Sequence, residues 1–297
     1  MSAVSIGVCA YNEERNIRAC MESIRRQRSA AFPIEEILIV SSGSTDATDD
    51  IVRRFEEQDR RFRLVRQERR EGKNSAINEF LKQAKGDIMV LVNADNRLDE
   101  GSLQHLLEPF ADAQVGVAGG HPVPVNDKES VVGFAVHMLW DMHHRISLVY
   151  PKIGELMAFR RLDQALPTTS QSDEDLIRID LEKRGLRSAY VPGAVVFNMG
   201  PATVADFWRQ RTRVNIGEKY LKRWFDYQVP TWNRRLLFAA VLGFVRDNAS
   251  HPFRLLMAVA LEALARAYST LYVTLDKGDR AVWNQVSSTK DLVADKR

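Results

Sequence analysis

Short apolar runs alternate with helical patterns through the first half of the chain. The apolar runs that predict strands are Val4 to Ala10, Ile37 to Val40, Phe62 to Val65, Ile88 to Val92 and Val115 to Gly120. Asn12 is a candidate cap for the helix after the first run, in which Ile17, Cys20, Met21 and Ile24 recur at helical spacing. This β-α-β-α order predicts an α/β fold with an open, mostly parallel sheet flanked by helices.

The second half has longer and less regular elements. Residues 131–148 read as a helix that contains Trp140, His143 and His144. The stretch "SDEDLIRIDLEKRG" predicts a helix with an acidic first turn and Gly185 just past its end. The stretch "SAYVPGAVVFN" indicates a strand pair or a bent strand, and "VADFWRQRTRVNIGEKYLKRW" indicates a long basic amphipathic helix.

Polar residues gather where three predicted strands end. The loops are Ala10–Glu13, Ser41–Asp46 and Asn93–Asn96. In open parallel sheets, ligands bind outside the carboxyl ends of the strands. We therefore expect these three loops to form one ligand-binding rim.

Asp95 is the most informative residue of that rim. It follows an apolar run in "VLVNADN" and has asparagines on both sides. Carboxylate and amide oxygens suit Mg²⁺ or Mn²⁺, which often takes substrate phosphates as further ligands. The alternative is that Asp95 caps the following turn, and its spacing alone favours the cap.

Each of the other charged candidates has two interpretations, one functional and one structural. Lys73 follows Gly72 before a helix and can meet a phosphate or stay solvated, without the spacing of a Walker motif. The acidic residues 173–175 open a helix, where they are candidates for a general base or for simple capping. Arg209 and Arg213 stand four residues apart, which suits diphosphate oxygens or a solvated helix face.

Composition narrows the class of protein. The 297 residues are 45% hydrophobic, and 42 basic and 39 acidic residues leave a net charge of +3, too small to indicate a nucleic-acid partner. Cys9 and Cys20 lie in apolar patterns, which predicts free core thiols in a reducing compartment. We find neither a signal-peptide pattern nor a window of about 20 uncharged apolar residues, and we expect a cytoplasmic protein.

The segment from Arg234 to Leu275 is apolar and basic. Its first apolar block, Leu236 to Val245, is too short to span a bilayer, and Glu262 and Arg266 interrupt its second block. Its helices either pack on the rest of the chain or lie in the membrane interface with their arginines at the headgroups. Trp224 and Trp232 are candidate interface residues, and the tail from Asp276 is expected to be partly mobile.

Seven stretches taken together resemble the inverting family 2 glycosyltransferases. In chain order they are "VSIGVCAYNEERNIRACMESI", "ILIVSSGSTDATDDI", "REGKNSAIN", "GDIMVLVNADN", "DEDLIRIDLEKRG", "YVPGAV" and "QRTRV", and they cover about residues 4 to 225. The resemblance implies a GT-A (Rossmann-like) catalytic domain at 1–225. Its nucleotide-sugar half would be about 1–120 and its acceptor half about 121–225, followed by a helical C-terminal extension at 226–297.

The resemblance also implies roles for individual residues. The nucleotide-sugar site would comprise Ala10, Tyr11, Asn12, Glu13, Ser42, Lys73, Asn93, Ala94, Gln210, Arg211 and Arg213. Glu13 would face the ribose or base, and Asn93-Ala94-Asp95 stands at the D-x-D position, where Asp95 would bind the metal. Glu174 and Asp175 match the family's E-D pair, whose Asp is the usual catalytic base.

The implied reaction is a metal-dependent, inverting transfer of one sugar from a nucleotide-diphosphate sugar, such as a UDP-sugar, to an acceptor hydroxyl. The expected cofactor is Mn²⁺ or Mg²⁺. The expected partners are the donor and a glycan or lipid-linked acceptor in cell-surface glycan or glycolipid synthesis, with peripheral membrane contact through 234–275 as one interpretation.

Four positions depart from the family pattern. Ser42 and Asn93 replace aspartates, Asn198 stands about where many members have a histidine, and Val214 replaces a tryptophan of processive synthases. An alternative function is therefore a non-catalytic sugar-nucleotide-binding or scaffold protein with this fold. A nucleotidyltransferase ranks last, because "AYNEERN" lacks the glycines of a phosphate loop.

Overall fold

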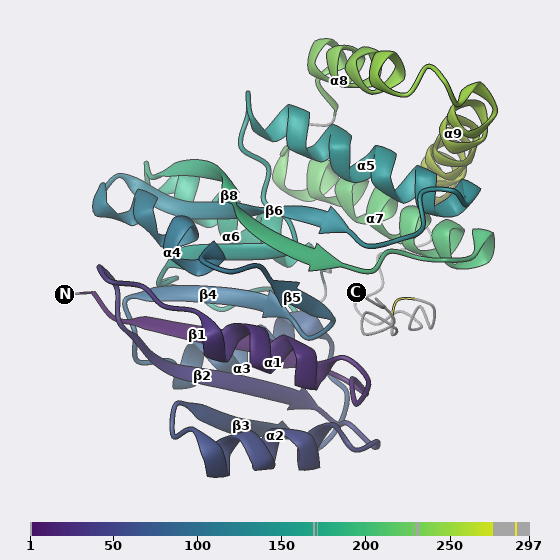
Figure 1. Cartoon of the computed structure of the whole chain (residues 1–297). Coiled ribbons are helices and arrows are strands. Elements are labelled where there is room, and N and C mark those ends of the chain that lie inside the picture. Colours follow the sequence, from purple (N-terminus) through teal and green to yellow (C-terminus); the bar gives the residue numbers. More distant parts are fainter. Residues whose placement is uncertain are drawn as a thin grey trace.

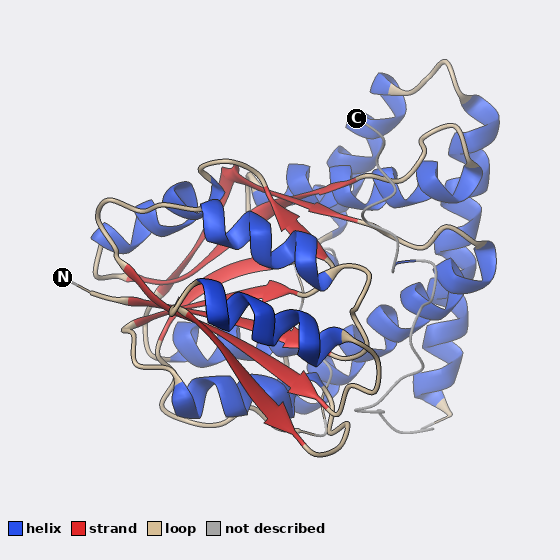
Figure 2. Ribbon diagram, turned by 60° about the horizontal axis from the view of Figure 1, so that its bottom comes forward, coloured by secondary structure: helices blue, strands red, loops and turns tan. Residues whose placement is uncertain are grey.

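The computed structural model describes residues 2–168, 170, 172–227, 229, 232–275 and 289. Within them, eight strands form one mixed sheet with helices on both faces (Figures 1 and 2). The strands are β1 Val4–Ala10, β2 Ile34–Ser42, β3 Phe62–Gln67, β4 Ile88–Asn93, β5 Asn96–Leu98, β6 Val115–Pro124, β7 Leu156–Arg160 and β8 Arg187–Asn198. The helices are α1 Ile17–Arg26, α2 Thr48–Gln58, α3 Lys73–Gln83, α4 Ser102–Leu107, the 3-10 helix Glu108–Ala111, α5 Val131–Ser147, α6 Asp173–Lys183, α7 Val204–Phe225, α8 Arg234–Asp247 and α9 Pro252–Thr274.

The strand order is β3-β2-β1-β4-β7-β6-β8-β5. The first four strands of this order are parallel, as predicted. β7 runs antiparallel between β4 and β6, β8 is parallel to β6, and the short β5 is antiparallel to β8. The predicted α/β class is therefore confirmed, and the parallel part of the sheet is its N-terminal half. Neither β5 nor β7 was predicted.

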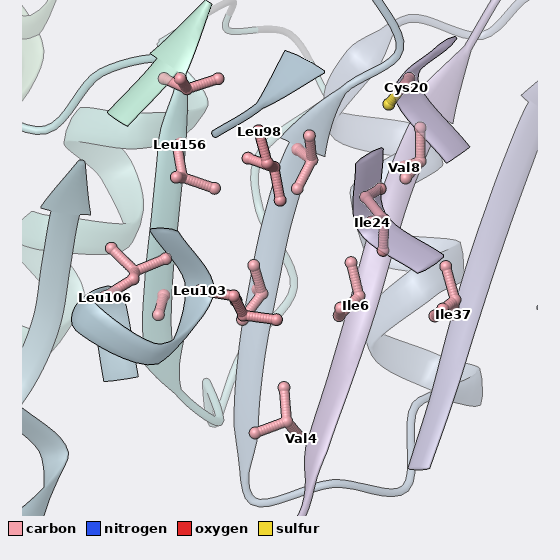
Figure 3. Close-up of a cluster of buried hydrophobic side chains, with 14 of the residues drawn as sticks. Val4, Ile6, Val8, Cys20, Ile24, Ile37, Leu98, Leu103, Leu106 and Leu156 are labelled. Atoms are coloured by element: carbon pink, nitrogen blue, oxygen red, sulfur yellow. The ribbon is translucent and has the colours of Figure 1, made fainter. Parts of the chain in front are cut away.

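Both faces of the parallel strands are buried. Side chains alternate across a strand, so Ile37 and Ile39 face one hydrophobic cluster while Leu38 and Val40 face the other. The first cluster packs β1, β2 and β4 against α1 and α4 (Figure 3). The second packs the opposite face against α3 and α6. Burial on both sides explains why these strands read as continuous apolar runs.

A close approach of α3 to the sheet depends on Gly7. A Cβ atom at this position would lie 2.7 Å from the ring of Phe80, which is fully buried on α3. A side chain on residue 7 would therefore push α3 away from β1. This contact sets the distance between the sheet and the helix that begins at Lys73.

The predicted cap of the first helix is wrong. Asn12 has a positive φ of 51°, and α1 begins five residues later at Ile17. The Asn12 Oδ1 instead accepts a hydrogen bond from the Thr45 backbone amide at 2.8 Å. Short polar side chains tolerate the left-handed region, so Asn12 shapes a loop and joins it to the loop after β2.

The C-terminal helices pack beside α5 and α7, away from the parallel strands (Figure 1). One apolar face of α8 and α9 is buried against α5, through residues such as Phe244 and Ala258. Their other face is exposed, and α9 is long and apolar enough to cross a membrane by length and composition. The predicted tail from Asp276 lies outside the described residues, apart from Thr289.

The two candidate interface tryptophans differ. Trp224 is 49% exposed. Trp232 is half-buried, and its indole Nε1 donates a hydrogen bond to Glu218 at 3.1 Å. The indole N–H of Trp232 is thus bonded within the protein, whereas Trp224 has the more exposed side chain, and the interface role of both stays a prediction.

Candidate active site

A cavity of about 510 Å³ opens at the carboxyl ends of β1, β2 and β4, where the polar loops predicted it. This volume is typical of pockets that bind small molecules. The predicted site residues that line the cavity are Ala10, Tyr11, Glu13, Ser42, Lys73, Asn93, Ala94, Asp95, Glu174, Asp175, Gln210, Arg211 and Arg213. Asn12 is the predicted site residue that does not line it.

Hydrogen bonds join the first two rim loops. The Asn12 backbone amide donates to Ser44 Oγ at 3.1 Å, and the Glu13 backbone amide donates to Thr48 Oγ1 at 2.8 Å. The buried Glu13 carboxylate accepts a hydrogen bond from Asn16 Nδ2 at 3.3 Å. Asn12 therefore supports the wall of the cavity rather than facing into it.

The wall beside these loops carries an aromatic ring and a cation. The guanidinium of Arg70 lies 4.3 Å from the ring centroid of Tyr11, and both residues line the cavity. Ser42 Oγ accepts a hydrogen bond from the Glu71 backbone amide at 3.3 Å. Ser42 thus fixes the segment that carries Arg70, in place of the carboxylate that the family resemblance led us to expect.

The turn after β4 brings Asp95 beside a second carboxylate, Glu155. The Nδ2 atom of Asn93 donates a short hydrogen bond to Glu155 Oε2, and Asn96 Nδ2 contacts the same oxygen at 3.3 Å. Burial, and then the negative charge of Glu155, raise the pKa of Asp95 to about 6. Glu155 was not predicted as a site residue.

The oxygen atoms around Asp95 suit a hard divalent cation. Asn96 and Asn198 are both buried in the cavity wall, and neither amide Oδ1 has a hydrogen-bond partner among the described residues. In the described part of the chain, no group of three or more His, Cys, Asp or Glu residues forms a complete metal site. A donor set of one or two carboxylates and amide oxygens fits Mg²⁺ or Mn²⁺ when a substrate supplies further oxygens.

The first turn of α6 places three carboxylates in the wall of the same cavity. Asp173 is buried and pairs with the ammonium of Lys73 at 2.9 Å. Burial opposes the charge on Lys73, but the negative charges of Asp173 and Glu174 outweigh it and raise the pKa of Lys73. The predicted Lys73 therefore belongs to the site, with a carboxylate partner from α6.

The other two α6 carboxylates have raised pKa values. Burial, together with the charge of Asp173, raises the pKa of Glu174 to about 8. Burial also raises the pKa of Asp175 to about 6, with Lys152 lowering it and Glu218 raising it. At neutral pH, Asp175 is thus mostly ionised and Glu174 mostly protonated, and a pKa near the working pH suits a general base.

The ion pair beside Asp175 comes from two other elements. Lys152 Nζ lies 3.3 Å from Glu218 Oε1, and both side chains are largely buried. Glu218 belongs to α7, and Lys152 precedes β7. These charges were not predicted, because nothing in their local sequence separates them from surface residues.

Three arginines of α7 lie in three different environments. Arg213 lines the cavity, where burial lowers its pKa and the nearby Glu155 and Asp173 partly restore it. Arg211 also lines the cavity, but its guanidinium binds Glu262 of α9 at 2.7 and 2.9 Å. Arg209 is exposed and pairs with Asp206 at 3.1 Å. The structure therefore does not bring Arg209 and Arg213 together as a diphosphate clamp.

Comparison with protein families gives a match over residues 5–171 to the model "Glycosyl transferase family 2". A poly-beta-1,6-N-acetyl-D-glucosamine synthase from Staphylococcus epidermidis is 25% identical over 228 residues, which are 72% of this chain and 54% of that protein. Glycosyltransferase GlyA from Streptococcus pneumoniae is 23% identical over 87% of this chain and 38% of its own. The chain spans about half the length, or less, of these curated relatives.

Solved structures share the fold. A mannosyltransferase from Pyrobaculum calidifontis, in complex with GDP-Man and Mn²⁺, has a TM-score of 0.59 and 24% identity, covering 92% of this chain and 79% of its own. Glucosyl-3-phosphoglycerate synthase from Mycobacterium tuberculosis, with Mn²⁺ and UDP, has a TM-score of 0.52 and 20% identity, covering 75% and 80%.

Proposed function

The chain belongs to glycosyl transferase family 2, an inverting family, and we propose that it transfers one sugar from a nucleotide-diphosphate donor to an acceptor hydroxyl. The observation that carries the proposal is the placement of Asp175 in one cavity with Asp95, Lys73 and Arg213. One carboxylate is poised to accept a proton, and the other groups suit a diphosphate and its cation.

The proposed mechanism is a single in-line displacement. Asp175 accepts the proton of the acceptor hydroxyl as its oxygen attacks the anomeric carbon, and the bond to the nucleoside diphosphate breaks. Attack from the side opposite the leaving group inverts the anomeric centre. Lys73 and Arg213 would stabilise the negative charge that develops on the leaving diphosphate.

Asp95 is the proposed ligand of a divalent cation, Mn²⁺ or Mg²⁺. When bound, this cation would supply Lewis-acid stabilisation of the departing diphosphate. The unpartnered amide oxygens beside Asp95 support this assignment. Glu174, with its pKa raised to about 8, is able to donate a hydrogen bond at neutral pH, and we assign it to the acceptor or donor sugar.

The acceptor is proposed to be a glycan or a lipid-linked molecule at the cytoplasmic face of a membrane. Support comes from the outer face of α8 and α9, where Phe238, Phe253 and Leu256 are each at least 66% exposed. Arg234, Arg235 and Arg246 are exposed at the ends of α8. An exposed apolar surface with basic residues at its margin suits the headgroup region of an anionic membrane.

Calorimetric binding of UDP, GDP and their common sugar conjugates, with and without Mn²⁺, tests the proposal. We expect one nucleotide class to bind, more tightly with Mn²⁺, and Asp95→Ala to lose the metal-dependent part. Asp50→Ala is the matched control, because Asp50 lies on the exposed surface of α2, paired with Arg53.

Absence of nucleotide binding by the folded protein would favour a scaffold protein that kept the fold. That outcome would also make Asp95 a turn cap. Sugar transfer by Asp95→Ala at the full rate would overturn the metal role while leaving the enzyme assignment intact.

A further inference from the structure

The sheet pairing places residue 155 beside residue 93. β4 and β7 are antiparallel, with Val92 opposite Leu156. The next pair outward, beyond the end of β7, is therefore Asn93 and Glu155. Their side chains are joined by the short hydrogen bond from Asn93 Nδ2 to Glu155 Oε2. A carboxylate thus lies next to the position at which the family resemblance led us to expect an aspartate.

Asn96 fixes the orientation of Glu155. Its Nδ2 donates to the Glu155 backbone carbonyl at 3.2 Å and lies 3.3 Å from Oε2. Asn96 is 1% exposed and belongs to β5, so this amide is held rigidly in the wall of the cavity. The Glu155 carboxylate is therefore held by two amides on the side of the turn that carries Asp95.

A buried amide oxygen without a partner gives a second, independent observation. β5 pairs with β8 so that Asn96 lies opposite Asn198. Asn198 is 6% exposed and lines the cavity, and its Oδ1 has no hydrogen-bond partner among the described residues. A buried polar atom without a partner is unfavourable, so a ligand that binds this oxygen would be stabilised.

We propose that Glu155 supplies the carboxylate that Asn93 lacks, so that Asp95, Glu155 and the Asn198 amide oxygen hold the divalent cation of this enzyme. The proposal rests on the proposed function. The D-x-D aspartate would have moved in sequence by 62 positions, from residue 93 to residue 155, while remaining at the same place in the fold.

The alternative is that Glu155 only positions Asn93. Glu155→Gln separates the two, because its amide oxygen can still accept the hydrogen bond from Asn93 Nδ2 while the carboxylate is lost, and a charge swap then returns a carboxylate to the pair. In the double variant Asn93→Asp/Glu155→Gln, the number of carboxylates is unchanged and the hydrogen bond between the two side chains can form with donor and acceptor exchanged. If Glu155 is a metal ligand, the swap should restore Mn²⁺ binding. The reason is that the unaltered protein and the double variant each have one carboxylate in the pair of residues 93 and 155.

The experiment measures Mn²⁺ binding to the full chain by electron paramagnetic resonance, with Mn²⁺ alone and with UDP or GDP added. We expect Glu155→Gln to weaken Mn²⁺ binding at least tenfold and the swap to recover most of that loss, since loss of a metal's supporting groups typically costs 10–100-fold. Glu79→Gln is the matched control, because the Glu79 carboxylate lies on α3 and accepts a hydrogen bond from Gln83.

Two outcomes overturn the inference while the proposed function stands. One is Mn²⁺ binding by Glu155→Gln as tight as that of the unaltered protein, and the other is a swap variant no better than Glu155→Gln. If Glu155→Gln does not fold, the swap compared with Asn93→Asp tests the same point, because removing the Glu155 carboxylate from Asn93→Asp should weaken Mn²⁺ binding. Failure of the unaltered protein to bind Mn²⁺ under any condition overturns this inference and the metal role of Asp95, whereas nucleotide binding and sugar transfer without Mn²⁺ would leave the proposed sugar transfer intact.

Discussion

The raised pKa of Asp175 affects both its proposed role as a base and the stability of the folded protein. Its carboxylate is buried at the start of α6, and burial raises its pKa to about 6. The folded state therefore favours the protonated form more than the unfolded state does. The proposed base must be ionised to act, so the burial that raises its pKa also destabilises the fold above about pH 6.

The pH dependence of catalysis follows from this pKa. We expect kcat/KM for the acceptor to rise with pH up to about 6, because Asp175 must be ionised to accept a proton, and to fall above about 8, where Glu174 loses the proton that it donates to the sugar. Asp175→Asn should lower kcat by about 10²–10⁴-fold, the usual contribution of a general base. The measurement is sugar transfer between pH 5 and 9, with the donor saturating.

Thermal melting provides the control for that variant. The pKa of Asp175 is raised on folding, so the unaltered protein loses stability as pH rises through this pKa, whereas Asp175→Asn does not. The difference in Tm should therefore widen, in favour of the variant, from pH 4 to pH 8. An inactive variant that melts well below the unaltered protein at pH 8 would contradict the assignment of Asp175 as a strained base.

The rim residues were predictable because their motifs are local. Asp95, Lys73 and Asp175 each stand at the boundary of a strand or helix, and the sheet gathers those boundaries at one edge. Glu155 was not predicted as a site residue, because it precedes the apolar run of β7 and belongs to no recognisable motif. Its meaning depends on pairing with Asn93, 62 residues earlier, which local sequence does not encode.

At the scale of elements, α7 is attached to α9 by a buried ion pair. Arg211 and Glu262 side chains are 14% and 11% exposed, and Arg266 also contacts Glu262 at 2.6 Å. The sequence led us to assign Arg211 to the substrate, because its partner lies 51 residues away in an apolar segment. The polar residues that interrupt α9 are thus explained by packing against α7.

Breaking this pair should destabilise the protein. We expect Glu262→Ala to lower the free energy of unfolding by about 3 kcal/mol, because Arg211 keeps a buried charge without its carboxylate partner. Arg209→Ala is the control, since the exposed pair with Asp206 should contribute less than about 1 kcal/mol. Urea denaturation of both variants checks the difference. Equal effects of the two variants would mean that the buried pair does not hold α9 in place.

The strand pattern was predictable where both faces of a strand are covered. β1 to β4 were each found as apolar runs for this reason. β5 has three residues and β7 has five, too few to establish a strand periodicity by themselves. They form strands because they pair with neighbouring strands: β7 lies between β4 and β6, and β5 pairs with β8.

At the scale of the whole molecule, the sheet domain and the C-terminal helices present different surfaces. α8 and α9 cover α5 with one face and expose the other (Figure 1). The two interpretations of residues 234–275 therefore are compatible. The inner face packs on the catalytic domain, and the outer face remains available for the proposed membrane contact.

Vesicle co-sedimentation tests that contact. We expect binding to vesicles that contain phosphatidylglycerol, weaker binding to phosphatidylcholine alone, and a decline with added salt, because arginines at a surface are screened. Phe238→Ser/Leu242→Ser should reduce the bound fraction severalfold. Val204→Ser is the control, since Val204 is 54% exposed at the start of α7. Unchanged binding in the double variant would exclude the outer face of α8 as the contact.

The strand order also sets when the site becomes complete during synthesis. β1 to β4 pair with one another within the first 93 residues. β5 pairs with β8, so it can join the sheet only after the chain has been synthesised to Asn198. Because chains fold from the N-terminus as they leave the ribosome, we expect the cavity loops after β1, β2 and β4 to form well before the wall that holds Asn96 and Asn198. A nascent chain would then carry half of its binding site for the time needed to translate about a hundred further codons.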